Sequence, residues 1–521
     1  MGVGSIIFIE SVFFNLKPMN HLKLIMILLI AAGLFSSNQS PEKKLNLYVD
    51  ADVVLHKMRG GAGASWHSMI HDIPLENEKY DYPVRHVNPR GSAYAGNPPL
   101  SDTAAWNRIY DHASWLGLNF LRVELSMNMY EPQRNVFDWE NDEMQALYRI
   151  LDWCESAGAD VFLQQMWGHV AWNAFPGVHP LLSSPHSLDD FANGIAALLK
   201  HLTRTRNYTC IKYFCMVNEP PGGPWGYWWS SGSHEGPSIT DAWRKLDETF
   251  KKEGIEVLIS GPDWTSLPPV IPEKLKFEEY LGALDVHSYN GIHHNEQAVQ
   301  TVADWVEFAR LKKKPFFITE IGNMSLGWGT DNKGPKSFRA ALSNASDVAV
   351  CLNLGVDGFN RWSFTNRGDM DGQWQLVKTY DIGTKTYTRN VTPEPEAYYG
   401  YAMVTRFMGK YASVLATRSS QDIEGVFYAA YKNMDGSIVI MAVNNLAEPV
   451  GMDVQMEAVS GNQPFYLYQI TERNVNEPGF KLDPVNEFKK ATELHPVQLA
   501  PESITVLTTI GLPHAEHGMI R

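Results

Sequence analysis

Residues 211–220 read Ile-Lys-Tyr-Phe-Cys-Met-Val-Asn-Glu-Pro, an apolar run that ends in an amide and a carboxylate. Residues 315–322 read Pro-Phe-Phe-Ile-Thr-Glu-Ile-Gly, and Glu320 closes this second run much as Glu219 closes the first. Short apolar runs bounded by polar or turn residues are typical of buried strands in a parallel sheet. A carboxylate is costly to bury at the end of such a strand, which makes Glu219 and Glu320 candidate functional residues.

Apolar runs of this kind alternate with helical patterns along most of the chain. The predicted strands cover residues 60–66, 119–125, 160–167, 211–218, 256–261, 284–289, 315–320 and 356–364. The predicted helices cover residues 102–116, 142–157, 187–204, 240–253, 297–311 and 338–353. Eight strands with intervening helices over about 300 residues predict an α/β fold, the (β/α)8 TIM barrel. A doubly wound open sheet is the alternative, but no Gly-x-Gly-x-x-Gly turn follows the first strand.

The sequence changes character after the Pro-Glu-Pro segment at 393–395. Alternating apolar and polar residues follow, for example at 425–431, 437–443 and 503–508. This alternation predicts a C-terminal antiparallel β-sandwich. Residues 45–50 alternate in the same way, so we expect them to add a strand to that sandwich. The predicted domains are a signal peptide region at 1–40, a catalytic barrel at 58–395, and a β-sandwich accessory domain formed by 45–57 plus 396–515.

The N-terminal region is typical of an export signal. From Met19, a short basic flank precedes an uncharged apolar run at 25–30, and small residues follow at 31–37. The apolar run is shorter than the ~20 residues that a membrane-spanning helix needs. We therefore predict a secretory signal peptide, a secreted or periplasmic location and no stable membrane insertion.

The composition argues against several classes of partner. The 521 residues include 44 Lys and Arg against 58 Asp and Glu, which gives a net charge of −14. Nucleic acids and anionic membranes bind basic surfaces, so neither is an expected partner. The 4 cysteines are too few and too scattered for a disulfide scaffold, and no Cys-x-x-Cys pair indicates zinc. The aromatic content of 12% fits either a large core or a cleft lined for sugar rings.

Polar and aromatic residues collect at the predicted carboxyl ends of the strands, where TIM barrels hold their active sites. In strand order these candidates are Arg122, Trp167, His169, Asn218, Glu219, Trp264, His287, Tyr289, Glu320 and Trp362. Two carboxylates across a barrel mouth can hydrolyse a glycosidic bond, one as proton donor and the other as nucleophile or base. A separation of ~5–5.5 Å would imply retention of configuration. For either glutamate taken alone, the alternative is an ion pair with an arginine at the barrel rim.

The pattern resembles the clan A glycoside hydrolases, retaining (β/α)8 enzymes with glutamates at the ends of strands four and seven. The Gly-Pro at 261–262, the Asp-x-His-x-Tyr at 285–289 and the trailing sandwich resemble glycoside hydrolase family 39 most. Families 5 and 30 are close competitors. The Met-Val at 216–217 departs from family 39, which usually has an acidic residue and Trp there. The resemblance covers about residues 58–400, and it extends to the sandwich only as architecture.

The resemblance implies a role for each candidate residue. Glu219 resembles the general acid/base, Glu320 the nucleophile, and Asn218 the residue that hydrogen-bonds the sugar 2-hydroxyl. An arginine close to a carboxylate lowers its pKa, so we expect Arg122 to lower the pKa of Glu320. The remaining candidates are expected to contact the glutamates or the sugar: His287, Tyr289, His169, Trp167, Trp264 and, as the preferred stacking platform, Trp362.

We therefore expect a secreted O-glycosyl hydrolase, either a retaining β-glycosidase or an endo-glycanase. It would cleave a β-glycosidic bond in an oligo- or polysaccharide by double displacement, with a carbohydrate substrate and no metal or organic cofactor. One alternative is a non-catalytic glycan-binding protein on the same fold, which the presence of both glutamates disfavours. Another is a metal-dependent barrel hydrolase, which would need His-x-His on the first strand, where His67 stands alone.

Overall fold

A computed structural model describes most of the chain after residue 42. The described residues are 43–68, 97–165, 171–178, 183–220, 228, 236–289, 291–324, 334–365, 374–381, 386–459 and 463–519. The chain divides into two units, Met1–Lys43 and Lys44–Arg521, and the second unit holds every element described below. The predicted signal peptide region lies outside the described residues.

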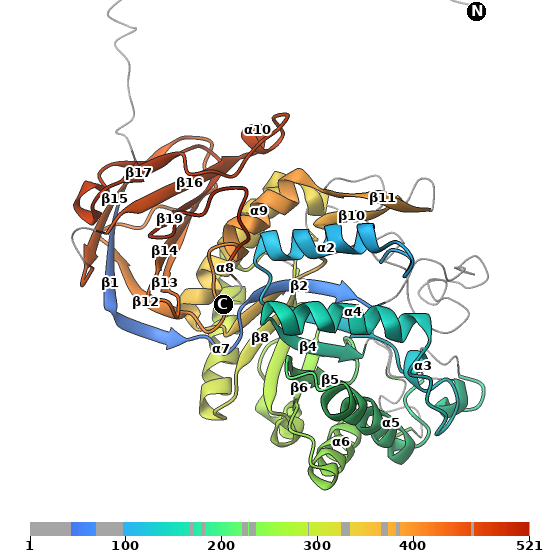
Figure 1. Cartoon of the computed structure of the whole chain (residues 1–521). Helices are drawn as coiled ribbons and strands as arrows, with labels where there is room; N and C mark the ends of the chain where they lie inside the picture. Colours follow the sequence, from blue (N-terminus) through green and yellow to red (C-terminus); the bar gives the residue numbers. More distant parts are fainter. Residues whose placement is uncertain are drawn as a thin grey trace, which may run out of the picture. The chain divides into compact units, whose positions relative to one another are not determined.

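Eight parallel strands close into a barrel in the order of the sequence (Figure 1). They are β2 (Ala62–His67), β3 (Phe120–Leu125), β4 (Asp160–Gln165), β5 (Ile211–Cys215), β6 (Leu258–Trp264), β7 (Ala283–Ser288), β8 (Phe316–Ile321) and β9 (Gly358–Arg361). The barrel closes because β2 pairs with β3 on one side and with β9 on the other. Nearly all residues of these strands are buried, as expected for a parallel sheet covered by helices. The (β/α)8 prediction is confirmed.

Helices follow the barrel strands and cover the outside of the barrel. They are α2 (Thr103–Leu116), α3 (Met127–Tyr130), α4 (Asp142–Ala157), α5 (Leu188–Lys200), α6 (Ile239–Glu253), α7 (Glu296–Leu311), α8 (Phe338–Leu354) and α9 (Pro395–Thr405). A polar side chain caps the amino end of several of them; Asp102, for example, accepts a hydrogen bond from the Ala105 amide at 3.0 Å. Between β9 and α9 the strands β10 (Val377–Asp381) and β11 (Thr386–Pro393) form a separate antiparallel pair.

The second sheet has nine strands in the order β17-β16-β19-β14-β13-β12-β1-β15-β18. Their bounds are β1 (Lys44–Lys57), β12 (Ser413–Ser419), β13 (Val426–Lys432), β14 (Ile438–Asn444), β15 (Val450–Glu457), β16 (Phe465–Thr471), β17 (Asn486–Phe488), β18 (Val497–Leu499) and β19 (Ser503–Thr508). The strand from before the barrel, β1, lies between β12 and β15. It is antiparallel to β12 but parallel to β15, so the sheet is antiparallel except for this one pair.

This sheet folds back on itself to form the β-sandwich. The Gln469 side chain on β16 donates a hydrogen bond at 2.8 Å to the Gln498 carbonyl on β18, although the two strands lie near opposite ends of the strand order. Apolar residues from both layers, among them Val454, Leu467 and Leu499, form the core between them. The predicted C-terminal sandwich is therefore confirmed as an architecture.

The barrel and the sandwich pack through α8 and α9, which lie between them (Figure 1). Leu352 on α8 and Val439 and Met441 on β14 belong to one continuous apolar core. Polar contacts also cross this interface: the Asn353 side chain on α8 donates to the Tyr428 carbonyl on β13 at 2.8 Å. The sandwich and the barrel therefore share one apolar core.

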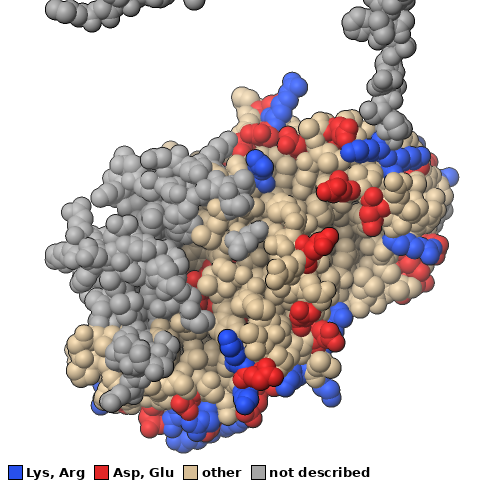
Figure 2. All heavy atoms as spheres, turned by 180° about the vertical axis from the view of Figure 1, so that it is seen from behind, with Lys and Arg blue, Asp and Glu red and all other residues tan. Residues whose placement is uncertain are grey.

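The described surface carries charges of both signs. Figure 2 shows one face, on which Asp and Glu side chains are interspersed with Lys and Arg side chains. In the part of the chain that the structure describes, no helix combines the length and the apolar character needed to cross a membrane.

Candidate active site

Glu219 and Asn218 lie in the turn that follows β5, at the carboxyl end of the barrel. Strand β5 ends at Cys215, three residues earlier than the predicted strand, so both side chains are held by a turn. The backbone of Glu219 has a φ of 43°, a left-handed conformation that costs a non-glycine residue about 1–2 kcal/mol. The Glu219 amide donates a hydrogen bond at 3.3 Å to Oδ2 of Asp263, which stabilises this turn.

Glu320 lies inside β8, and its side chain is 5% exposed. Its Oε1 accepts a hydrogen bond from Nη1 of Arg122 at 2.6 Å. Its Oε2 accepts the hydroxyl of Tyr289 and lies 3.2 Å from Nδ1 of His287. Burial raises the pKa of Glu320 to about 7, although His287 and Arg122 act in the opposite direction. Arg122 lowers this pKa, as expected, but the cost of burying the charge exceeds the attraction of the two cations, so the pKa is raised overall.

The two glutamates are close neighbours, with His287 between them. Nδ1 of His287 lies 2.7 Å from Oε1 of Glu219, and one ligand atom from each of Glu219, His287 and Glu320 lies within 4.8 Å of the others. Inverting glycosidases hold their carboxyl groups about 6.5–9.5 Å apart to admit a water molecule, whereas retaining enzymes need only about 5–5.5 Å. The observed spacing fits attack by a carboxylate on the sugar.

Arg122 on β3 is fully buried next to the two glutamates. It hydrogen-bonds to Glu320 and to Asn218, the neighbour of Glu219. Its Nη2 donates to Oδ1 of Asn218 at 2.7 Å and lies 3.5 Å from Oδ2 of Asp263, while Nη1 donates to Glu320 and Glu124. Burial alone would lower the pKa of Arg122, but the surrounding carboxylates raise it above its ordinary value. Arg122 is therefore a permanent cation that links the two halves of the site.

His287 is an imidazolium at neutral pH. Burial disfavours its charge, but Glu320, Asp263 and the hydrogen bond to Glu219 raise its pKa well above the ordinary value. Its Nε2 lies 3.0 Å from Oδ1 of Asp263. Both ring nitrogens therefore donate, Nδ1 to Glu219 and Nε2 to Asp263.

Aromatic side chains lie beside the cluster formed by Arg122, Glu219, His287 and Glu320. Trp362 follows β9; the edge of its ring contacts His67 at a centroid distance of 5.2 Å, and Cζ of Arg122 lies 5.8 Å from its ring. The ring of Tyr289 meets the ring of Trp374 edge-on at 5.4 Å. Trp362 thus lies beside Arg122 and His67, and Trp374, which was not among the candidates, lies beside Tyr289.

Three predicted aromatic and imidazole contacts are not part of the described cluster. The ring of Trp264 packs against Phe277 at 5.9 Å and Trp305 at 6.4 Å, and its contact with the sugar stays a prediction. Trp167 and His169 lie outside the described residues. The other predicted residues are all brought together: Arg122, Asn218, Glu219, His287, Tyr289, Glu320 and Trp362.

The structure adds two acidic residues that the sequence pattern does not single out. Glu124 follows Arg122 by two positions on β3, faces the same side, and lies 2.8 Å from Nε2 of His67. Asp263 is the extra residue of a β-bulge, since the pairing of β6 with β7 passes from Pro262 directly to Trp264. Bulges are common beside active sites because they redirect one side chain. No sequence signal marks a bulge in advance, although Asp263 does end an apolar strand.

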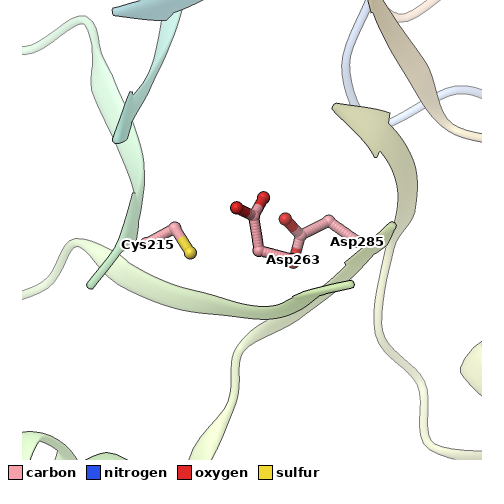
Figure 3. A group of neighbouring side chains, drawn as sticks. All are labelled: Cys215, Asp263 and Asp285. Carbon is pink, nitrogen blue, oxygen red and sulfur yellow. The ribbon is translucent and has the colours of Figure 1, made fainter. Parts of the chain in front are cut away.

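Two groups of side chains have the spacing of a metal site, but their chemistry does not fit one. They are Glu219 with His287 and Glu320, and Cys215 with Asp263 and Asp285 (Figure 3). Their carboxylate oxygens already accept hydrogen bonds from cations or hydroxyls: Arg122, His287, Tyr289, Ser260 and Thr319. A metal ion would have to displace these donors and lie against the charges of Arg122 and His287.

A separate cavity lies at the opposite end of the barrel. It has a volume of about 1110 Å³, and its lining includes Asp160, Ile211 and Leu258, the first residues of β4, β5 and β6. Catalytic residues of TIM barrels lie at the carboxyl ends of the strands. This cavity is therefore not the active site.

Comparison with known proteins agrees with this geometry. The family model described as cellulase (glycosyl hydrolase family 5) matches residues 81–356, more than half of the chain. This segment contains both Glu219 and Glu320. The expected leaning towards family 39 is not confirmed, and the matching family is one of the two close competitors.

Solved structures share the fold at low sequence identity. A family 30 subfamily 8 xylanase from Clostridium acetobutylicum aligns with a TM-score of 0.57 and 15% identity, over 89% of this chain and 99% of its own. The catalytic domain of a family 30 xylanase C from Talaromyces cellulolyticus aligns with a TM-score of 0.58 and 15% identity, over 89% and 99%. A conserved exported protein from Bacteroides fragilis aligns with a TM-score of 0.61 and 12% identity, over 89% and 99%.

No curated protein sequence matches the chain. The family model, the closed barrel and the two adjacent glutamates nevertheless agree with one another. The chain belongs to the cellulase family, glycosyl hydrolase family 5, and is a glycosidase.

Proposed function

We propose that the protein is a secreted, retaining glycoside hydrolase that cleaves β-glycosidic bonds in an oligo- or polysaccharide by double displacement. The observation that carries this proposal is the close approach of Glu219 and Glu320, whose nearest ligand atoms lie within 4.8 Å of each other and of His287. In this mechanism one carboxylate attacks the anomeric carbon while the other protonates the departing oxygen.

Glu320 is the proposed nucleophile. It lies inside a strand, and Arg122, Tyr289 and His287 contact its two oxygens. These donors fix the orientation of the carboxylate and stabilise its charge before the attack. When an oxygen of Glu320 bonds to the anomeric carbon, the glycosidic bond breaks and the leaving oxygen takes a proton.

Glu219 is the proposed source of that proton. It lies on a turn at the mouth of the barrel and has hydrogen-bond contact with only one of the two cations, His287. In the second step the Glu219 carboxylate removes a proton from water, the hydroxyl oxygen attacks the anomeric carbon, and the ester bond to Glu320 breaks. Two displacements on opposite faces restore the original configuration.

Asn218 is the proposed contact to the sugar hydroxyl next to the anomeric carbon. Its Oδ1 already accepts the hydrogen bond from Arg122 at 2.7 Å. The amide nitrogen of Asn218 is therefore the group left to donate to a sugar oxygen. A hydrogen bond at this hydroxyl strengthens as the transition state forms.

The mechanism is tested with aryl β-glycosides and polysaccharides as substrates. Proteins of the same fold are described as family 30 xylanases and an endo-β-1,6-glucanase, so the panel includes xylan and β-1,6-glucan beside cellulose derivatives. Proton NMR of the first product should show the β-anomer before mutarotation. An α-anomer formed first would refute the retaining mechanism.

The nucleophile is tested by chemical rescue. Glu320→Ala should abolish hydrolysis, and added azide should restore cleavage of an activated aryl glycoside and give a glycosyl azide of inverted configuration. Glu273→Ala, at an exposed position on the same barrel, is the control and should behave as wild type. Azide rescue of a Glu219 variant with inversion, instead of the Glu320 variant, would reverse the assignment.

Secretion is proposed from the segment at 19–37, in which a basic flank, an apolar run and small residues follow one another. N-terminal sequencing of protein recovered from the medium or periplasm should begin shortly after that segment. Recovery of the uncleaved chain from the cytoplasm alone would contradict this part of the proposal.

A further inference from the structure

A second layer of buried acidic groups lies directly beneath the two glutamates. Asp263 on β6 and Asp285 on β7 are neighbours across the pair of strands, and both are fully buried. Figure 3 shows their carboxyl groups next to each other, with the thiol of Cys215 on the facing strand. Neither aspartate is exposed to solvent, so neither has a place in the proposed bond-breaking steps.

Asp263 contacts His287, Arg122 and the backbone amide of Glu219. Its Oδ1 lies 3.0 Å from Nε2 of His287, and its Oδ2 accepts the Glu219 amide at 3.3 Å and lies 3.5 Å from Nη2 of Arg122. Like Glu219, Asp263 has a left-handed backbone, with a φ of 56°, and it occupies a β-bulge. Two residues with unfavourable backbone conformations, Glu219 and Asp263, are thus joined by a hydrogen bond. Such conformations occur mostly at functional sites.

Asp285 has a different environment. Its Oδ1 accepts the Ser260 hydroxyl at 3.0 Å, its Oδ2 lies 3.2 Å from Oγ1 of Thr319, and it hydrogen-bonds to Asp263. In the described part of the chain no hydrogen bond or ion pair joins Asp285 to a cation, whereas Asp263 contacts two, His287 and Arg122. Adjacent buried carboxyl groups cannot both be ionised. Burial and the charge of Asp263 raise the pKa of Asp285 well above its ordinary value, so Asp285 is the member that holds the proton.

We propose that Asp263 is a positioning residue for the acid/base Glu219, and that Asp285 supports Asp263 only as a neutral hydrogen-bond donor. Asp263 acts on Glu219 through His287 and through the backbone amide. The inference rests on the proposed roles of Glu219 and Glu320.

The charge of Asp263 decides which way the proton of Glu219 points. With Asp263 ionised, His287 keeps both ring protons, and Nδ1 donates to Oε1 of Glu219. The acid proton then has to sit on Oε2 of Glu219. Without that charge, His287 can become neutral, and its bare Nδ1 would accept the proton of Glu219 and hold it away from the leaving group.

The protonation of His287 depends on groups from every strand packed against it. Glu219 after β5, Asp263 on β6 and Glu320 on β8 contact the His287 ring and raise its pKa. Asp285 lies two residues before His287 on β7, and Arg122 on β3 and Tyr289 after β7 both hydrogen-bond to Glu320. Removing Asp263 takes away the only one of these carboxylates that contacts Nε2 among the described residues.

The test compares the same isosteric change at both members of the acidic pair, Asp263→Asn and Asp285→Asn. The substrates are the phenyl and 2,4-dinitrophenyl β-glycosides of the sugar that the wild-type enzyme cleaves. For Asp263→Asn we expect kcat/KM on the phenyl glycoside to fall about 10²–10³-fold, because general acid catalysis of that size is lost. The dinitrophenyl glycoside needs no proton for its leaving group, and its kcat/KM should fall less than about tenfold.

Asp285→Asn is the matched control. One neutral hydrogen-bonding group replaces another, so kcat/KM should stay within about fivefold of wild type for both glycosides. Asp263→Glu keeps the charge and should recover part of the phenyl glycoside activity. Turnover of the dinitrophenyl glycoside by the Asp263→Asn protein shows that the measured sample is folded.

A second readout needs no substrate. Nitrogen-15 NMR of histidine-labelled protein, assigned with His287→Gln, should show a charged His287 ring in wild type and Asp285→Asn, and a neutral ring in Asp263→Asn. Equal effects of the two substitutions, or an equal loss on both leaving groups, would overturn the inference. A wild-type enzyme that cleaves no glycoside would contradict the proposed function, and the NMR result would still decide the role of Asp263.

Discussion

Replacing Glu320 with Gln should make the protein more stable while it abolishes activity. Burial raises the pKa of Glu320 from an ordinary value of 4.5 to about 7. The folded protein is therefore less stable relative to the unfolded chain when Glu320 is ionised than when it is protonated, even with Arg122 and His287 in contact. Gln has nearly the shape of the protonated side chain and carries no charge, so it removes this cost.

The size of the effect follows from the pKa shift. One pKa unit corresponds to about 1.4 kcal/mol, so a rise from 4.5 to about 7 corresponds to about 3 kcal/mol. The unfolded chain loses the proton near pH 4.5, whereas the folded protein keeps it until about pH 7. The stability that this proton contributes is fully present at low pH and is lost as the pH rises through that window. Glu320→Gln should therefore exceed wild type by about 3 kcal/mol at pH 8 and match it near pH 4.

Urea unfolding of both proteins at several pH values measures this difference. Glu278→Gln is a control of opposite sign. Burial disfavours the charge of Glu278, but hydrogen bonds from Lys312 and Lys314 outweigh that effect and lower its pKa. Glu278→Gln should therefore destabilise the protein at neutral pH, and less so under acid conditions.

The reasoning would be refuted by a stability difference between Glu320→Gln and wild type that does not change with pH. Only a titrating group can create that dependence. It would also be refuted if Glu320→Gln were the less stable protein at pH 8, because the attraction of the two cations would then exceed the cost of burial.

Three further predictions concern catalysis. Tyr289→Phe removes the hydroxyl that binds Oε2 of Glu320. A hydrogen bond to a charged group contributes about 1.5–3 kcal/mol, so kcat/KM should fall about 10–150-fold. An unchanged kcat/KM would show that this hydrogen bond does not stabilise the transition state. Glu320 has to be ionised to attack the anomeric carbon, so kcat/KM should rise as the pH increases towards about 7, the pKa of Glu320. A value of kcat/KM that does not change between about pH 5 and 7 would show that this ionisation does not control the reaction. Activity should survive prolonged treatment with EDTA, because hydrogen bonds from the protein already occupy carboxylate oxygens of Glu320, Asp263 and Asp285. Loss of activity that Ca²⁺ or Zn²⁺ restores would show instead that the enzyme depends on a metal ion.

Much of this protein can be predicted from local sequence patterns. Parallel strands buried on both sides have to be continuous apolar runs, so the eight barrel strands are visible one at a time. A charge at the end of such a run is conspicuous, and Glu219 and Glu320 are recognisable for that reason. Because the carboxyl ends of barrel strands meet at one face, Glu219 and Glu320 can be expected to lie together although they are 101 positions apart in the chain.

Other features depend on contacts between distant segments. Trp264 is the last residue of β6, and its position in the sequence does not show that its ring packs against Phe277 and Trp305. β1 pairs in parallel with β15 because this N-terminal strand is inserted between β12 and β15 of the sandwich. Neither result follows from propensity or periodicity.

The electrostatics of the site were decided by tertiary structure alone. Sequence shows that Arg122 and Glu320 have opposite charges, but only burial in the closed barrel makes the pKa of Glu320 rise instead of fall. Asp263 and Asp285 have the same side chain on neighbouring strands, yet contact with His287 and Arg122 lowers the pKa of the first, whereas burial and the charge of the first raise the pKa of the second. Sequence determined which ionisable groups meet at the barrel mouth. The depth of burial and the few ångströms between them determined which of those groups carry a charge, because solvation and Coulomb energies change steeply over such distances.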